Sequence, residues 1–396
     1  MNNDNIENEG EFSLYTETIV QSPFEKYKKQ IAILRGVVAG AVLCLVIFAV
    51  AMLVQKLTKK EEVENYIQRT PLTFQKDEYS IYGRSPSMET DEPDISRIQY
   101  WINAIIYNAS RSILYIGEDT VGVVIGESDG DYVILTENHS DWPDENYYIS
   151  ISDEVNIPTT VIRKDADSGI ALLAVKKSEV TAAGRTPEVV KAGNSYGVKQ
   201  NEIVIALGRV QSNAKGYAAG YVKENNTLEN DVDISYDILE TNIELKEDDY
   251  ALIFGVNANL IGISHVTKVG DEIRKNVIGI SSVKTLIEEM SSGIPAGSMG
   301  IKCTNITKDI SEQFNFPEGI YVTEVEVDSP AYKAGLQAGD IIYEYNGGTV
   351  GSVQDFSDMI LMSEKGDSVT IKLKRTGRGG EYRELEYTVK MGLRLD

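Results

Sequence analysis

The N-terminal part of the chain contains one long apolar stretch and then loses its apolar periodicity. No residue from Gly36 to Val54 is charged, and a helix of this length nearly crosses a hydrocarbon core of about 30 Å. We expect a transmembrane helix over residues 31–57, preceded by a cytoplasmic tail at residues 1–30. The alternatives are a cleaved signal peptide and a buried core helix. Residues 58–93 are polar and charged, and they predict a linker.

The pattern then changes to a short helix followed by many short strands. Ile98, Trp101, Ile102 and Ile105 recur at three- and four-residue steps, which predicts a helix from Ile95 to about Ser112. Short β-type runs follow, separated by Gly, Asp, Asn and Ser, and they predict a barrel or sandwich of antiparallel strands. These runs are 112–117, 120–126, 131–136, 147–151, 159–164, 170–175, 202–208, 217–222, 237–243, 251–256 and 260–266.

The last part of the chain mixes helices and strands. A strand at its start is followed by Ser-Pro-Ala, which opens a short helix, and then by Gly-Asp and another strand. Ser352 is the expected N-cap of a second helix, with Asp355 three residues later in a near capping box. The alternating segments 367–377 and 384–390 predict a hairpin. This part is therefore expected to be an α+β domain.

Composition excludes several classes of function. The formal net charge is −23 and no basic stripe is visible, so a nucleic-acid partner is not expected. The two cysteines, Cys44 and Cys303, do not form a disulfide framework, because Cys44 lies in the apolar stretch. Two isolated histidines, His139 and His265, do not make a zinc site, so we expect no metal and no cofactor.

Long motifs in both later parts resemble the HtrA/DegP-type serine proteases, which are trypsin-like. "SPAYKAGLQAGDIIYEYNG" within residues 319–350 is similar to the family's PDZ signature, and "GVVIGESDGDYVILTENH" and "DADSGIALLAV" are similar to its protease domain. The resemblance covers about Ile95 to Leu395. It implies a mostly β chain: a trypsin-like double β-barrel at 94–292 and an α+β PDZ domain at 297–394. It also implies an N-terminal anchor with both domains outside the cytoplasm; the flanking lysines and arginines balance and do not set the orientation.

The same resemblance assigns the catalytic triad, and only its histidine is kept. His139 falls on the family's histidine, Gly169 on its aspartate and Tyr250 on its serine. Asp167 is two residues from Gly169, so a register slip would bring a carboxylate back. The oxyanion turn becomes Asp248-Asp249-Tyr250. This places negative side chains beside the position where the substrate oxygen would become negative during the reaction. We therefore expect a vestigial site, with His139 and His265 as ordinary satisfied histidines.

The PDZ domain retains the features that recognise a peptide. The resemblance places the loop that binds a terminal carboxylate at Ser298, Met299, Gly300 and Ile301. On the helix that follows Ser352, Val353 and Ser357 are expected to face the groove and Phe356 and Ile360 the core; the alternative is that Val353 is simply buried.

The resulting interpretation is a membrane-anchored pseudoprotease of the HtrA type, single-pass in the cell membrane. It would bind peptides or exposed C-termini in envelope quality control, as a sensor, adaptor or holdase. The first alternative is an active extracytoplasmic serine endopeptidase. The second is a structural subunit that forms homo- or hetero-oligomers with active paralogues.

Overall fold

The computed structural model describes residues 68–77, 95–138, 143–152, 154–211, 213–269, 272–377 and 379–394. All of them belong to one compact unit, Tyr66–Asp396. The predicted membrane segment at 31–57 and His139 lie outside the described residues. No helix among the residues described is both long and apolar enough to cross a membrane.

The first β domain is a seven-stranded antiparallel sheet in the order β5-β4-β1-β2-β3-β7-β6. Helix α2 (Ile95–Ser110) leads into it, two residues shorter than predicted at its C-terminal end. Strand β5 was not predicted from the sequence. The strands of this sheet are β1 (Ile113–Ile116), β2 (Thr120–Ser128), β3 (Asp131–Glu137), β4 (Tyr148–Ser152), β5 (Val155–Pro158), β6 (Thr160–Asp165) and β7 (Ile170–Lys176). The helix η1 (Asp144–Asn146) precedes β4, and α3 (Lys177–Ala182) follows β7.

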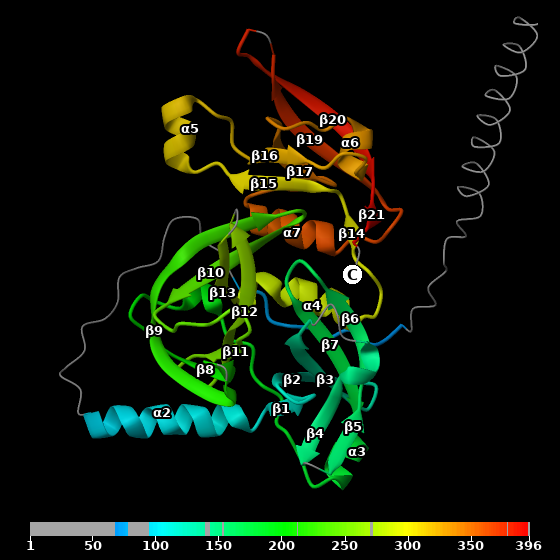
Figure 1. Cartoon of the computed structure of the whole chain (residues 1–396). Helices are drawn as coiled ribbons and strands as arrows, with labels where there is room; N and C mark the ends of the chain where they lie inside the picture. The colour runs from blue at the N-terminus through cyan, green and yellow to red at the C-terminus, as the bar shows by residue number, and fades with distance from the viewer. Residues whose placement is uncertain are drawn as a thin grey trace, which may run out of the picture. The chain divides into compact units, whose positions relative to one another are not determined.

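The second β domain is a closed barrel in the order β10-β13-β12-β11-β8-β9. Its strands β9 and β10 form a long hairpin (Figure 1), and helix α4 follows the barrel. Strand β13 was not predicted from the sequence. The strands are β8 (Ile203–Val210), β9 (Asn213–Asp231), β10 (Ile234–Thr241), β11 (Tyr250–Phe254), β12 (Leu260–Val269) and β13 (Glu272–Gly279); the helices are η2 (Ser195–Gly197), η3 (Ile280–Val283) and α4 (Lys284–Ser291).

The third part is an α+β domain around one antiparallel sheet, β15-β16-β17-β19-β20, with β18 paired to β17. The N-cap predicted at Ser352 is present, and Ser329 caps the short helix in the same way: their Oγ atoms accept from the backbone N–H of Asp355 and Tyr332. Its elements are β14 (Gly297–Ser298), β15 (Ile301–Asn305), α5 (Lys308–Phe314), β16 (Ile320–Val325), α6 (Pro330–Ala334), β17 (Ile341–Tyr345), β18 (Gly348–Thr349), α7 (Val353–Leu361), β19 (Ser368–Thr376), β20 (Tyr382–Lys390) and β21 (Gly392–Leu393).

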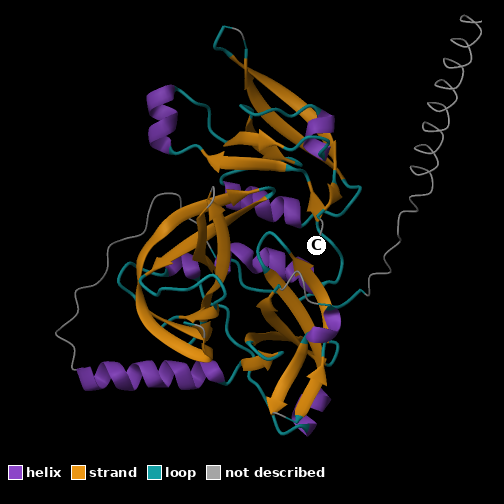
Figure 2. Cartoon of the chain, in the orientation of Figure 1, coloured by secondary structure: helices purple, strands orange, loops and turns teal. Residues whose placement is uncertain are grey.

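Strands dominate the described residues (Figure 2), and their apolar faces form the interior. Separate clusters of buried side chains fill the first sheet, the second barrel and the α+β domain. A further cluster joins residues of both β domains and includes Ile125, Leu172 and Leu252. The fold is therefore a mostly β pair of domains, a seven-stranded sheet and a closed barrel, followed by an α+β domain.

Residues 68–77 correct the prediction of a polar linker over 58–93. This segment, which we call the strap, lies along the first β domain, and Leu72 and Phe74 pack on the cluster that both β domains share. Gly126 makes room for it, since a Cβ there would lie 2.5 Å from Leu72 Cδ2. Arg69 pairs with Asp131 at 2.8 Å. Polar composition hid the strap, because its apolar side chains are few and have no helical or strand periodicity.

Candidate functional site

The position assigned to the catalytic aspartate is a tight turn between β6 and β7. Gly169 has a φ of +69°, in the left-handed region that glycine adopts most readily. Its carbonyl accepts the Asn138 N–H at 2.9 Å, which ties the turn to the end of β3, directly before His139. The turn therefore lies beside the end of β3, and position 169 offers no carboxylate.

Neighbouring acids of this turn are held by an arginine. Arg394 Nε donates to Asp165 Oδ1 at 2.9 Å, and its Nη2 donates to Asp167 Oδ2 at 3.0 Å. Asp165 and Arg394 are both buried. Burial opposes ionisation of Asp165, but the charge and hydrogen bonds of Arg394 outweigh it, so the pKa of this carboxyl is lowered. Asp167, the residue considered for a register slip, is thus engaged with Arg394.

His265 occupies the space beside the glycine. Its Nδ1 lies 3.0 Å from the carbonyl oxygen of Ser168, and a Cβ added to Gly169 would lie 3.9 Å from the same nitrogen. The ring is buried and stacks at a tilt against Tyr236, with 5.5 Å between centroids. These contacts agree with the expectation that His265 is a structural histidine of β12.

The position assigned to the nucleophile is buried. Tyr250 opens β11, is 1% exposed, and its hydroxyl has no hydrogen-bond partner among the described residues. Burial, with a smaller effect of the Glu137 charge, raises the pKa of the phenol well above its ordinary value. A neutral, enclosed phenol is neither a nucleophile nor a proton donor to a substrate.

The turn before Tyr250 is fixed by an aspartate. Asp249 is fully buried, and its Oδ2 accepts from the backbone N–H groups of Gln211 and Lys246, both at 2.9 Å. In a protease this turn presents N–H groups to a developing oxyanion. Here a buried carboxylate organises it, so the field at this turn opposes negative charge on a substrate.

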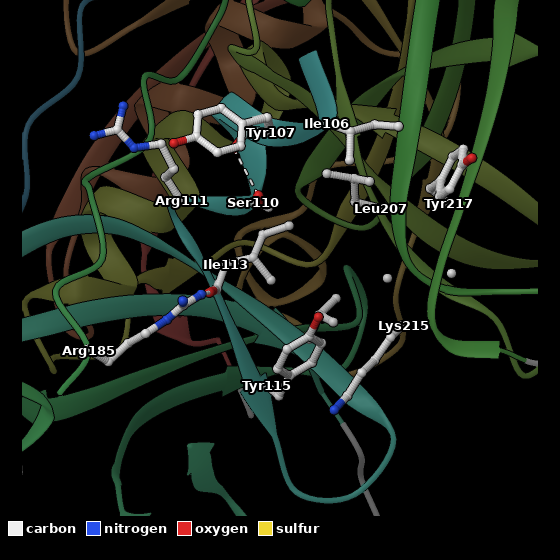
Figure 3. Close-up of a pocket in the computed structure, with 13 residues that line it drawn as sticks. Ile106, Tyr107, Ser110, Arg111, Ile113, Tyr115, Arg185, Leu207, Lys215 and Tyr217 are labelled. Atoms are coloured by element: carbon white, nitrogen blue, oxygen red, sulfur yellow. Dashed lines mark hydrogen bonds between the residues drawn. The ribbon is translucent and has the colours of Figure 1, made fainter. Parts of the chain in front are cut away.

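A cavity of about 570 Å³ lies beside the Tyr250 backbone. Gly208 and Val121 line it, and a Cβ at Gly208 would lie 2.4 Å from the Tyr250 carbonyl oxygen. Tyr115 and Lys215 face each other at its edge (Figure 3), with Lys215 Nζ 4.5 Å from the ring centroid. Its cations are engaged: Arg111 pairs with Glu188, and Arg185 donates to the Ile113 carbonyl at 3.3 Å. The cavity offers apolar and aromatic surface, and the Oγ of Ser110, the serine that lines it, donates to the Tyr107 carbonyl at 2.8 Å.

The predicted carboxylate loop is assembled around a carboxylate of this chain. Ser298 Oγ and the N–H of Met299 donate to Asp233 Oδ2, each at 2.8 Å. The N–H of Gly300 donates to both oxygens, at 2.9 and 2.8 Å, and the N–H of Ile301 donates to Oδ1 at 3.1 Å. The structure thus brings together all four loop residues, with a carboxylate as their common acceptor.

The two helix residues predicted to face a groove are buried. Val353 is 2% exposed and belongs to the α+β core, next to Phe356 and Ile360. Ser357 is 7% exposed, and its Oγ donates to the Val353 carbonyl at 2.8 Å. Helix α7 also packs against β10 of the barrel, where Gln354 contacts Ser235. An open groove along Val353 and Ser357 is therefore absent from this conformation.

Asp233 and Arg394 were not singled out from the sequence. Asp233 is one acid among several in a turn between strands, and Arg394 is an isolated cation after the last predicted strand. Neither has a local motif, because each acts on a segment far along the chain. The described residues contain no group of three or more His, Cys, Asp or Glu side chains able to hold a metal ion.

Comparison with known proteins agrees with this architecture. Residues 297–389 match the PDZ domain family model. The chain is 25% identical over 271 residues to a probable periplasmic serine endoprotease DegP-like of Hahella chejuensis, covering 66% of this chain and 55% of that protein. It is 28% identical over 281 residues to the periplasmic pH-dependent serine endoprotease DegQ of Escherichia coli, covering 65% and 56%. The chain spans little more than half the length of these relatives.

Solved structures share the fold. The HtrA-type protease AlgW with decapeptide has a TM-score of 0.51 at 15% identity, covering 74% of this chain and 99% of that one. The same protease with tripeptide gives 0.52 at 18% identity, covering 74% and 98%. In sequence relatives and in fold, the chain is similar to the HtrA/DegP-type serine proteases, with a PDZ domain after the protease-type domain.

Proposed function

We propose that this chain is a membrane-anchored HtrA-type pseudoprotease that binds peptides or exposed C-termini through its PDZ domain. The observation that carries the proposal is the buried Tyr250 hydroxyl at the start of β11, where the family has its serine. A serine protease needs an accessible hydroxyl, an imidazole and a carboxylate. Position 250 supplies no accessible hydroxyl, and position 169 supplies no carboxylate.

The immediate surroundings of Tyr250 supply no substitute nucleophile. No serine lies between Thr241 and Ile263. The next one, Ser264, is 5% exposed, and its Oγ accepts the Ala251 N–H at 2.9 Å. Its hydroxyl therefore serves to join β11 to β12. Losing the nucleophile removes most of the rate in this class of enzyme.

Peptide recognition is supported by the loop at Ser298–Ile301. Three successive backbone N–H groups and one hydroxyl converge on a single carboxylate, which is the donor set that captures a chain terminus. Each such charge-assisted bond is stronger than a neutral one. The solved relative AlgW carries a decapeptide, and the proposal extends peptide binding to this chain.

Membrane attachment and location rest on the sequence and on the relatives. The uncharged stretch at 36–54 would be a single-pass anchor, with residues 58–396 outside the cytoplasm, and both relatives named above are described as periplasmic. Protease shaving of intact cells tests this orientation. Cleavage of the N-terminal tail with full protection of the PDZ domain would reverse it. The proposal includes the formation of oligomers by this chain, with itself or with active paralogues.

Labelling with a fluorophosphonate tests the pseudoprotease directly. The reagent reacts with an activated serine, so the purified full chain should stay unlabelled and should not degrade casein. A His139→Ala variant is the matched control. Labelling or casein cleavage that disappears in this variant would establish an active endopeptidase in place of the proposed function.

A further inference from the structure

The carboxylate that fills the PDZ loop comes from the barrel domain. Asp233 lies in the turn between β9 and β10, with a φ of +62°, a conformation in which aspartate is among the more tolerated residues. It is 4% exposed. Its own N–H donates to the Ile301 carbonyl at 2.8 Å, so the turn contacts the loop through backbone as well as side chain.

Asp233 uses the donors that a peptide terminus would need. A carboxylate has two oxygens and about four acceptor sites. The N–H groups of Met299, Gly300 and Ile301 and the Ser298 hydroxyl all point at these two oxygens. A second carboxylate would find no free donor in the loop, and it would approach a buried charge of the same sign. Occupation by Asp233 and by a peptide terminus therefore exclude each other.

Other residues of the hairpin contact β15 and α7. Lys302 of β15 pairs with Asp231 at 3.3 Å. On the other side, Gln354 Nε2 of α7 lies 3.3 Å from both the carbonyl and the hydroxyl oxygen of Ser235. Leu228 packs on the core of the α+β domain. Thus the β9–β10 hairpin contacts both β15 and α7, the strand and the helix between which a PDZ ligand lies.

We propose that Asp233 is an internal ligand of the PDZ domain, and that a peptide terminus binds only after displacing the β9–β10 turn. This inference rests on the peptide-binding function proposed above. A peptide can bind only those molecules in which the site is open. The apparent affinity for the peptide is therefore the intrinsic affinity multiplied by the open fraction. A turn in place in about 99% of molecules would weaken peptide binding by about 100-fold.

The test compares the full chain in detergent with its Asp233→Ala and Asp233→Asn variants. Glu224→Gln is the matched control, because it removes an exposed acid from β9 of the same hairpin, outside the β9–β10 turn that contacts the loop. The probe is a fluorescein-labelled decapeptide pool with random apolar residues at its last three positions, as free acid and as C-terminal amide. We expect both Asp233 variants to bind the free acid at least about tenfold more tightly than the parent and the Glu224 variant.

Hydrogen exchange without peptide tests the internal contact separately. The amides of Met299, Gly300 and Ile301 should exchange at least about tenfold faster in Asp233→Ala, and at the parent rate in Glu224→Gln. Unchanged exchange in both Asp233 variants would overturn the internal ligand. So would equal peptide affinity in the parent and both Asp233 variants. Faster exchange with no peptide binding in any form would support the internal ligand and refute the proposed peptide function.

Discussion

Tyr250 is a buried core residue that carries one unsatisfied polar atom. Its ring belongs to the cluster shared by the two β domains, and its hydroxyl has no partner among the described residues. A buried polar group without a hydrogen bond costs about 1–3 kcal/mol. The apolar ring therefore stabilises the fold while the hydroxyl opposes it, the reverse of what a catalytic residue requires.

We predict opposite effects for two substitutions of this residue. Tyr250→Phe should leave the free energy of unfolding unchanged or raise it by about 1 kcal/mol, because only the unpaired hydroxyl is lost. Tyr250→Ser should lower it by about 3–5 kcal/mol, because a cavity replaces the ring. Urea denaturation followed by circular dichroism measures both. Destabilisation by Tyr250→Phe would reveal a partner for the hydroxyl.

Restoring the family residues should not restore proteolysis. The double variant Gly169→Asp/Tyr250→Ser supplies both missing side chains, but the new aspartate would have to adopt a φ of +69°. The buried Asp249 carboxylate would also remain beside the oxyanion turn. We expect no casein cleavage above that of the parent in a fluorescence assay. Cleavage that depends on His139 would show that the two residues were the whole of the defect.

Among the elements, those with a strong local pattern were predictable from the sequence. The helix at α2, the capped helix α7 and the hairpin β19–β20 were all expected, because periodicity and caps act over a few residues. Strands β5 and β13 were missed, because "VNIP" is too short and "EIRKNVIG" is polar over half its length. The strap was missed because the contacts that stabilise it are not local. Its hydrogen-bond partners lie far along the chain, as Ser291 does for the Leu72 N–H.

The strap should contribute to stability through one buried ion pair in particular. Lys284 Nζ pairs with Asp77 Oδ2 at 2.6 Å, and the two side chains are only 9% and 11% exposed. Breaking a buried pair from one side costs about 3–5 kcal/mol. We therefore expect Lys284→Gln to lower the urea midpoint markedly. Lys76→Gln is the control, since Lys76 is largely exposed where it pairs with Asp358, and such a pair is worth about 0–1 kcal/mol. Equal effects would mean that the strap is not held at Asp77.

At the scale of the whole molecule, Arg394 joins three segments that are distant in sequence. It pairs with Asp165 and Asp167 on the β6–β7 turn, and its Nη1 donates to the Val232 carbonyl at 3.4 Å, next to Asp233. The β6–β7 turn, to which the sequence resemblance assigns the family's aspartate, thus anchors the end of the PDZ domain and the β9–β10 turn. The sequence resemblance did not indicate this role of Arg394, because it shows at position 169 only that the aspartate side chain is missing.

The Arg394–Asp165 pair should give the stability a pH dependence of predictable sign. The folded pKa of Asp165 lies below its ordinary value of 3.8, so the parent keeps the contribution of the pair above that pH and loses it as the pH falls further. Arg394→Gln leaves a buried, unpaired carboxylate and should cost about 3–5 kcal/mol at pH 7. Without the guanidinium, burial dominates and raises the pKa of Asp165, so this carboxyl takes up a proton as the pH falls and part of the cost disappears. The urea midpoints of the parent and of Arg394→Gln, measured from pH 7 to pH 4, should therefore converge. Lys177→Gln is the control: it breaks the exposed pair with Glu127, and its midpoint should stay near that of the parent at every pH. A constant gap between the parent and Arg394→Gln would show that Arg394 acts through packing and its bond to Val232, and that its charge on Asp165 contributes little.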